Sequence, residues 1–89
     1  MNIADERVIR AKILHKLMRI NKWEHSHTAI ENLQKSFPKH LRGNVEKIVD
    51  ELMREGLLHL KPTSYGKHVS LNILKKEEIE KMVSALVKL

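Results

Sequence analysis

Apolar residues recur every three or four positions along most of the chain, which is the spacing of one face of an α-helix. This pattern predicts a first helix from about Ala4 to Ile20, a third from about residue 41 to 55, and a last from about Lys76 to Lys88. The apolar arc of the first helix is wide, roughly 220° at ~100° per residue. We therefore expect it to pack on two sides, against the core and against another helix or subunit.

A short second helix is predicted between the first and the third. Thr28 and Glu31 have the spacing of a capping box, in which the hydroxyl and the carboxylate accept hydrogen bonds from free amides at a helix start. We expect this helix to run to about Ser36, because Pro38 disfavours helical geometry at the residue before it. Upstream, residues 23–25 contain the only tryptophan and would form a short edge strand.

Alternating apolar and polar residues predict a β-hairpin after the third helix. Its strands would extend from Leu57 to Pro62, which closes the first strand, and from Lys67 to Asn72, joined by residues 63–66. Gly56 stands just past the helix end, where a left-handed residue is common. The fold class is thus mainly α with a small β-hairpin, in one domain spanning residues 1–89.

The charge balance narrows the possible partners. The chain of 89 residues has 17 Lys and Arg against 11 Asp and Glu, a net charge of +6 that suits a polyanion. It has no cysteine, which excludes a disulfide framework and the common structural zinc sites. No apolar run approaches the ~20 residues needed to cross a bilayer, and no signal peptide starts the chain, so we expect a soluble, cytoplasmic protein without membrane contact.

Enzyme chemistry finds little support in the sequence. The six histidines include His25 and His27, but no third ligand lies at a familiar metal-binding spacing, so we interpret them as surface residues. No catalytic triad and no phosphate-cradling glycine loop is present. We therefore expect no enzymatic activity, no metal and no cofactor.

The outer face of the third helix carries the most informative residues, Gly43, Asn44 and Lys47. A helical glycine costs about 0.5–1 kcal/mol relative to alanine, so something should compensate for it. A missing side chain near the helix start would allow close approach to a phosphate or a base edge. Recognition helices read bases with their N-terminal residues, Asn pairing with adenine and Lys with guanine. The alternative is that Gly43 relieves crowding against the second helix.

The hairpin tip, residues 61–68, carries basic and hydroxyl-bearing side chains and no acidic residue, which suits contacts to the sugar-phosphate backbone. Tyr65 would either join these contacts or lie back on the sheet. Cations just before the third helix would clamp phosphates where the helix dipole favours anions. The candidate DNA-binding residues are Lys39, His40, Arg42, Gly43, Asn44, Lys47, Lys61, Thr63, Tyr65 and Lys67, with Lys35 and Thr28 adding to the clamp.

The second half of the third helix argues against DNA binding. Glu46, Asp50 and Glu51 would repel phosphates, so only the first half of the helix should enter a groove deeply. Arg54 adds little, because Asp50 stands four residues earlier and would form an ordinary surface pair with it.

The segments Val45-Glu-Lys-Ile-Val-Asp-Glu-Leu-Met-Arg-Glu-Gly-Leu-Leu58, Lys61-Pro-Thr-Ser-Tyr-Gly66 and Val69-Ser-Leu-Asn72 resemble the winged helix-turn-helix superfamily, and more narrowly small archaeal proteins of that type. The resemblance covers roughly residues 4–71 and implies a three-helix core, a wing and a C-terminal helix. Family members often regulate transcription as dimers. The resemblance therefore implies a nucleoid-associated homodimer on double-stranded DNA, with helix 41–55 in the major groove and wing 61–68 on the backbone. The acidic outer face of the third helix departs from this pattern.

A protein-interaction adaptor is the alternative function, because winged helices also dock proteins. The surplus apolar surface of the first and last helices would then bind a partner. We expect the last helix to pack on a first helix, its own or that of a second copy, since its apolar stripe would otherwise face water. RNA binding has less support because stacking aromatic residues are scarce.

Overall fold

The computed structural model describes the backbone of residues 3–87 and the side chains of residues 6–86. Within these residues the chain is mainly helical and carries a small antiparallel sheet of strand order β1-β3-β2. The helices and strands, in chain order, are α1 (Ile3–Arg19), β1 (Thr28–Ala29), α2 (Ile30–Gln34), the 3-10 turn η1 (Lys39–Leu41), α3 (Arg42–Arg54), β2 (Leu58–Thr63), β3 (Gly66–Leu71), the 3-10 turn η2 (Ile73–Lys75) and α4 (Lys76–Val87).

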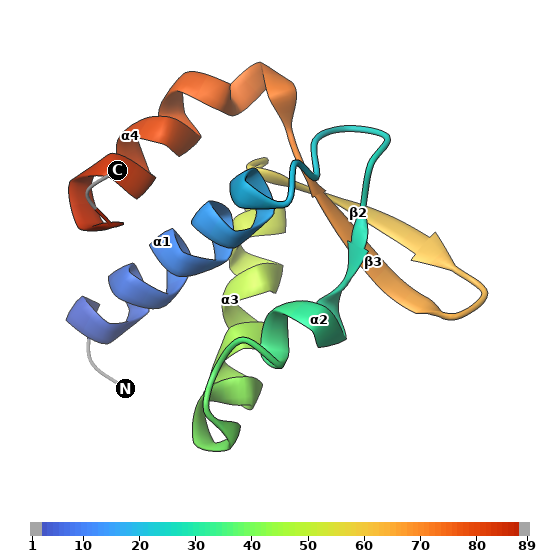
Figure 1. Cartoon of the computed structure of the whole chain (residues 1–89), viewed down its shortest axis with the longest axis horizontal. Helices are drawn as coiled ribbons and strands as arrows, with labels where there is room; N and C mark the ends of the chain where they lie inside the picture. The colour runs from blue at the N-terminus through green and yellow to red at the C-terminus, as the bar shows by residue number, and fades with distance from the viewer. Residues whose placement is uncertain (1–2, 88–89) are drawn as a thin grey trace.

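Helix α1 packs on both α3 and α4, which explains its wide apolar arc (Figure 1). Ile13 and Leu17 of α1 are fully buried, and so are Ile79 and Val83 of α4. The second packing partner expected for the first helix is therefore the α4 of the same chain. The apolar stripe of α4 no longer requires a second copy, and the homodimer stays a prediction.

The predicted capping box at the second helix is wrong. Thr28 belongs to β1, where it lies opposite Val69 and is only 7% exposed. The residue that precedes α2 is Ala29, and no side chain caps this helix. Pairing with β3 holds Thr28 in a strand, one residue before the position that could cap α2. Its hydroxyl instead accepts a hydrogen bond from the side-chain amide of Asn32 at 3.0 Å. The helix ends at Gln34 rather than near Ser36.

The edge strand predicted at residues 23–25 is also wrong. Trp23 makes one isolated parallel bridge to Leu71, and the chain then turns away. The turn requires left-handed backbone at Asn21 (φ 59°) and at Glu24 (φ 51°), which no extended strand contains. The amide of Glu24 donates to the carbonyl of Leu71 at 3.0 Å, and the amide of Leu71 donates to the carbonyl of Lys22 at 2.8 Å. The segment between α1 and β1 is therefore hydrogen-bonded to the end of β3.

The predicted β-hairpin is confirmed, with a tighter turn than expected. Pro62 does not close the first strand, because it pairs with Lys67 and the strand continues for one more residue. Strand β2 lies at the sheet edge, where proline is tolerated if its nitrogen faces outward. Leu60 of β2 is 43% exposed, because the hairpin projects beyond the core (Figure 1). Gly56 has the left-handed conformation predicted for it, with φ of 79°.

Candidate nucleic-acid interface

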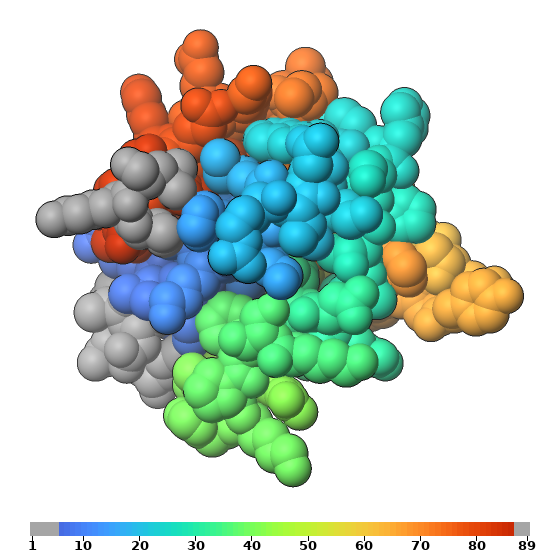
Figure 2. All heavy atoms as spheres, viewed as in Figure 1, coloured from blue at the N-terminus to red at the C-terminus, as the bar shows by residue number. Residues whose placement is uncertain are grey.

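The candidate DNA-binding residues fall into two groups in the structure. The first, which we name the α3 tip, comprises residues 39–47 of η1 and the first half of α3. The second, the hairpin tip, comprises residues 61–68. Figure 2 shows the residues around η1 (green) and the end of the hairpin (yellow-orange) as two protrusions, with the segment containing α2 between them. The fold thus brings each group together but keeps the two groups apart.

Gly43 faces open space at the α3 tip. A Cβ built on this residue would meet no atom within 4 Å, so the alternative that Gly43 relieves crowding against the second helix is wrong. Lys47, one turn further along, is exposed, and Asn44 is half-buried. Lys39 and His40 are exposed in η1, directly before the helix. The start of α3 therefore exposes its backbone at Gly43, between the exposed side chains of Lys39 and Lys47.

Arg42 is less free than the other cations of the α3 tip. Its side chain is half-buried, and its Nε is buried without a hydrogen-bond partner among the described residues. Its carbonyl oxygen accepts a hydrogen bond from the side-chain amide of Gln34 at 3.0 Å. Arg42 therefore joins the start of α3 to α2. The clamp expected on the second helix is wrong for Thr28, which is buried, whereas Lys35 is exposed.

The hairpin tip divides into residues that build the turn and residues that reach outward. The hydroxyl of Thr63 donates to the carbonyl of Gly66 at 2.7 Å and accepts from the amide of Tyr65 at 3.1 Å, so it closes the turn. The side chain of Tyr65 is 94% exposed and does not lie back on the sheet. Lys67 is exposed, whereas Lys61 is half-buried opposite His68. Of the four candidate residues in the hairpin tip, Tyr65 and Lys67 are thus the exposed ones.

A histidine pair joins β3 to the residue that precedes β1. The Nδ1 atoms of His27 and His68 lie 2.9 Å apart, and the two rings meet edge to face. One ring must donate a proton to the other for this contact to be a hydrogen bond. Of the residues that the structure describes, no three from His, Cys, Asp and Glu form a group that could hold a metal ion.

The acids at the end of α3 are turned toward α1. Arg10 of α1 forms a two-pronged ion pair with Glu55, with Nη1 and Oε2 at 2.8 Å, and its Nη1 lies 3.8 Å from Glu51. The hydrogen bond from Arg10 lowers the pKa of Glu55 below its ordinary value. The predicted Asp50–Arg54 pair is not among the ion pairs within 4.0 Å in the described part of the chain. Part of the repulsion expected from α3 is therefore neutralised.

Glu24 also holds the segment between α1 and β1 against β2 and η2. The Glu24 carboxylate accepts a hydrogen bond from the amide of Ile73 at 2.7 Å and contacts the ring of His59 at 3.3 Å. The hydrogen bond from the Ile73 amide, more than that from His59, lowers the pKa of Glu24. Glu24 therefore serves the fold and lies outside the candidate interface.

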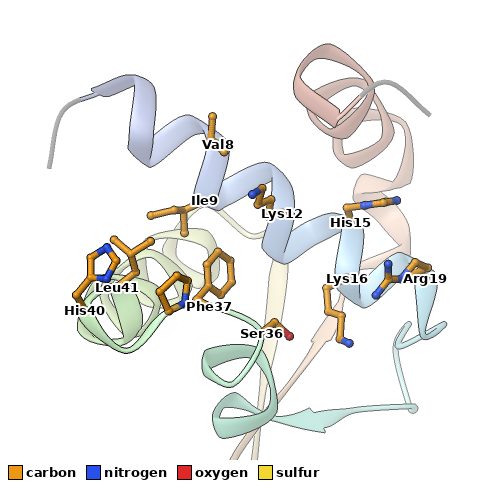
Figure 3. A pocket seen from close by; sticks show the side chains of 11 residues that line it. Val8, Ile9, Lys12, His15, Lys16, Arg19, Ser36, Phe37, His40 and Leu41 are labelled. Carbon is orange, nitrogen blue, oxygen red and sulfur yellow. The ribbon is translucent and has the colours of Figure 1, made fainter.

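One basic surface was missed at the level of sequence. Lys12, His15, Lys16 and Arg19 follow one another along α1 at helical spacing and line a groove against residues 36–41 (Figure 3). Testing the helical period on cations, and not only on apolar residues, would have found this stripe. The sequence gives no indication that residues 36–41 lie beside it.

Comparisons with known proteins leave the family open. No protein-family model, curated protein or solved structure matches this chain. A function for this chain is therefore inferred from the geometry of its described residues.

None of the described helices has both the length and the apolar character needed to cross a membrane.

Proposed function

We propose that this protein binds double-stranded DNA as a winged helix-turn-helix protein. The order helix, strand, helix, helix, strand, strand and the strand order β1-β3-β2 support this architecture. The observation that carries the proposal is Gly43, a helical glycine that fills no packing need and faces open space. The first half of α3 would enter the major groove, and the hairpin tip would follow the backbone.

The α3 tip has the physical features that a phosphate or a base edge requires. The positive end of the helix dipole favours an anion, although the amide of Arg42 is already bonded to the carbonyl of Lys39 in η1. A bare Gly43 allows backbone to approach that anion closely, and the exposed Lys47 lies one turn further along the helix. Asn44 and Lys47 supply the groups that pair with adenine and guanine.

The hairpin tip would add contacts that do not depend on base sequence. Tyr65 and Lys67 reach into solvent at the end of a projecting hairpin, and no acid lies between residues 61 and 68. A hydroxyl and an ammonium group of this kind contact phosphate oxygens and fix the position of a protein on the duplex.

Polarisation of a fluorescent 20-base-pair duplex tests the proposal. Contacts to about six phosphates should reduce affinity roughly a thousand-fold between 50 and 200 mM salt. Lys47→Glu and Lys67→Glu should each weaken binding, whereas Lys81→Glu, which makes the same charge change at an exposed position of α4, should change it little. Absence of binding at low salt, or an equal loss in all three variants, would contradict the proposal.

A DNA-binding protein of this kind would act as a transcriptional regulator or a chromatin-associated protein in the cytoplasm, at the nucleoid. A homodimer is part of this proposal, although the apolar stripe of α4 is covered by α1 in the same chain. Sedimentation at several protein concentrations tests it. A single species of monomer mass at all concentrations would refute the dimer but leave DNA binding intact.

The alternative, a protein-interaction adaptor, retains one specific observation. Leu74 is 88% exposed and the neighbouring Ile73 is 44% exposed, so η2 presents apolar surface to solvent. An adaptor should associate with itself or with a partner at high salt, and Leu74→Ser should abolish that association. Association that is lost in Lys47→Glu and Lys67→Glu but retained in Leu74→Ser would exclude η2 as the adaptor surface.

A further inference from the structure

A groove on α1 adjoins the α3 tip, with which it shares His40 and Leu41, and its other lining residues lie outside the proposed DNA interface. It lies between α1 and residues 36–41 and has a volume of about 580 Å³ (Figure 3). Pockets that bind small molecules commonly measure ~300–1,000 Å³. The groove is therefore large enough for an organic ligand of moderate size.

The polar lining of the groove consists of three Lys and Arg side chains, two histidines and Ser36. Lys12, Lys16 and Arg19 come from α1, together with His15, and His40 comes from η1 on the other side. No carboxylate is among the lining residues, and none of the three Lys and Arg side chains pairs with an acid in the described part of the chain. Like charges that line one cleft raise the local concentration of anions.

Apart from Ser36, the rest of the lining is apolar, and part of it belongs to the core. Ile9 and Phe37 belong to the hydrophobic core and show one side to the groove, and Leu41 is half-buried beside them. In Figure 3 these side chains gather at one end of the groove, and Lys16 and Arg19 lie toward the other. A ligand that fits both ends needs an anionic head and an apolar body.

We propose that this groove binds an amphiphilic organic anion. The head lies on the cations of α1, where hydrogen bonds between ionised groups are the strong ones. The apolar body covers Phe37 and Ile9 and so leaves water. Binding in this groove does not rest on the proposed DNA function.

Two-dimensional amide NMR of the full chain, without DNA, tests the proposal. Decanoate and decyl phosphate serve as probes because they have similar apolar chains but carry different anionic heads, a carboxylate and a phosphate. Either anion should shift the amides around Lys12, Lys16, Phe37 and His40 in a saturable manner. Acetate has the head alone, and decyltrimethylammonium has the chain with the opposite charge, so both should bind at least about tenfold more weakly.

A matched pair of variants separates the groove from net charge. Lys12→Gln with Lys16→Gln removes two cations from the groove, and Lys76→Gln with Lys81→Gln removes two from α4. Lys12, Lys76 and Lys81 are exposed and Lys16 is half-buried, and none of them belongs to the core, so folding should survive. The first double variant should bind decanoate at least about tenfold more weakly, because each lost hydrogen bond to a charged head removes a substantial contribution. The second should bind as the wild type does.

Several results would overturn the proposal. Equal binding of decanoate and decyltrimethylammonium would show that charge has no role, and equal binding of acetate would show that the apolar end has none. Shifts confined to η2 and α4 would place any binding elsewhere. If duplex DNA shifts the amide signals of the groove and neither decyl anion does, the basic residues of α1 belong to the DNA surface instead.

Discussion

Replacing Gly43 with alanine separates the stability of α3 from its proposed use. Gly43 is helical, and an added Cβ would meet no atom within 4 Å, so the substitution introduces no clash. Alanine in a helix is favoured over glycine by about 0.5–1 kcal/mol. Since Gly43 lies in the first turn, where fewer helical bonds depend on it, we expect a gain of about 0.5 kcal/mol. For a domain of this size that raises Tm by roughly 2–4 °C.

Gly56→Ala is the matched control. Its Cβ would also meet open space, but its φ is 79°, where an L side chain is strained. That strain costs roughly 1–2 kcal/mol, so the same change of one methyl group should lower Tm at this position. Thermal unfolding followed by circular dichroism compares the two variants with the wild type.

The functional expectation for Gly43→Ala has the opposite sign. If backbone at Gly43 approaches a phosphate or base edge, a methyl group there should weaken duplex binding about tenfold, which corresponds to ~1.4 kcal/mol. A lower Tm for Gly43→Ala would refute the open environment of this residue. An unchanged DNA affinity in a stabilised variant would refute the reason that we give for the glycine.

Three further predictions concern the fold. Because Arg10 lowers the pKa of Glu55, the stability that their pair provides is complete above the ordinary value of 4.5 and is lost as pH falls through the lowered pKa. In urea titrations from pH 7 to pH 3, Glu55→Gln should therefore lose about 0.5–1 kcal/mol at pH 7 and little at pH 3, and equal losses at both would contradict the pairing. A double-mutant cycle of His27→Ala and His68→Ala should give a coupling of about 0.5–1 kcal/mol, and strictly additive effects would show that the 2.9 Å contact contributes nothing. Ile79→Ala leaves a cavity where α4 packs on the core, so it should cost about 2–5 kcal/mol of unfolding free energy, and a loss below 1 kcal/mol would show that α4 is dispensable for folding.

The elements predicted correctly from sequence are those with a long, regular pattern. Helix α3 repeats its apolar residues at helical spacing over thirteen positions. In the hairpin, apolar and polar residues alternate on both sides of a turn next to Gly66. Residues close together in sequence were therefore enough to predict both elements. The capping box at Thr28 failed because β3, a partner distant in sequence, draws that residue into a strand. The turn at Glu24 could not be predicted, since its left-handed residues are not glycines.

The candidate site shows the same division. The exposure of Gly43, Lys47 and Lys67 follows from their place outside the apolar stripes. The burial of Thr28 and the anchoring of Arg42 depend on tertiary contacts that no local pattern encodes. The use of Thr63 within the turn is local, because its hydroxyl bonds residues two and three positions later. The groove was missed for the same reason, because its two walls come from separate parts of the chain.

The sheet ends in ways that limit how copies of this protein can meet. Its outer members are β1, which has only two residues, and β2, in which Pro62 cannot donate a backbone hydrogen bond. Exposed strands recruit other chains through a continuous row of unpaired amides and carbonyls, and short or proline-containing borders interrupt that row. Two copies therefore have little opportunity to join their sheets into one. Any assembly of this chain must be built through side chains on its helices and turns, which are positions that single substitutions can change without disturbing the strands.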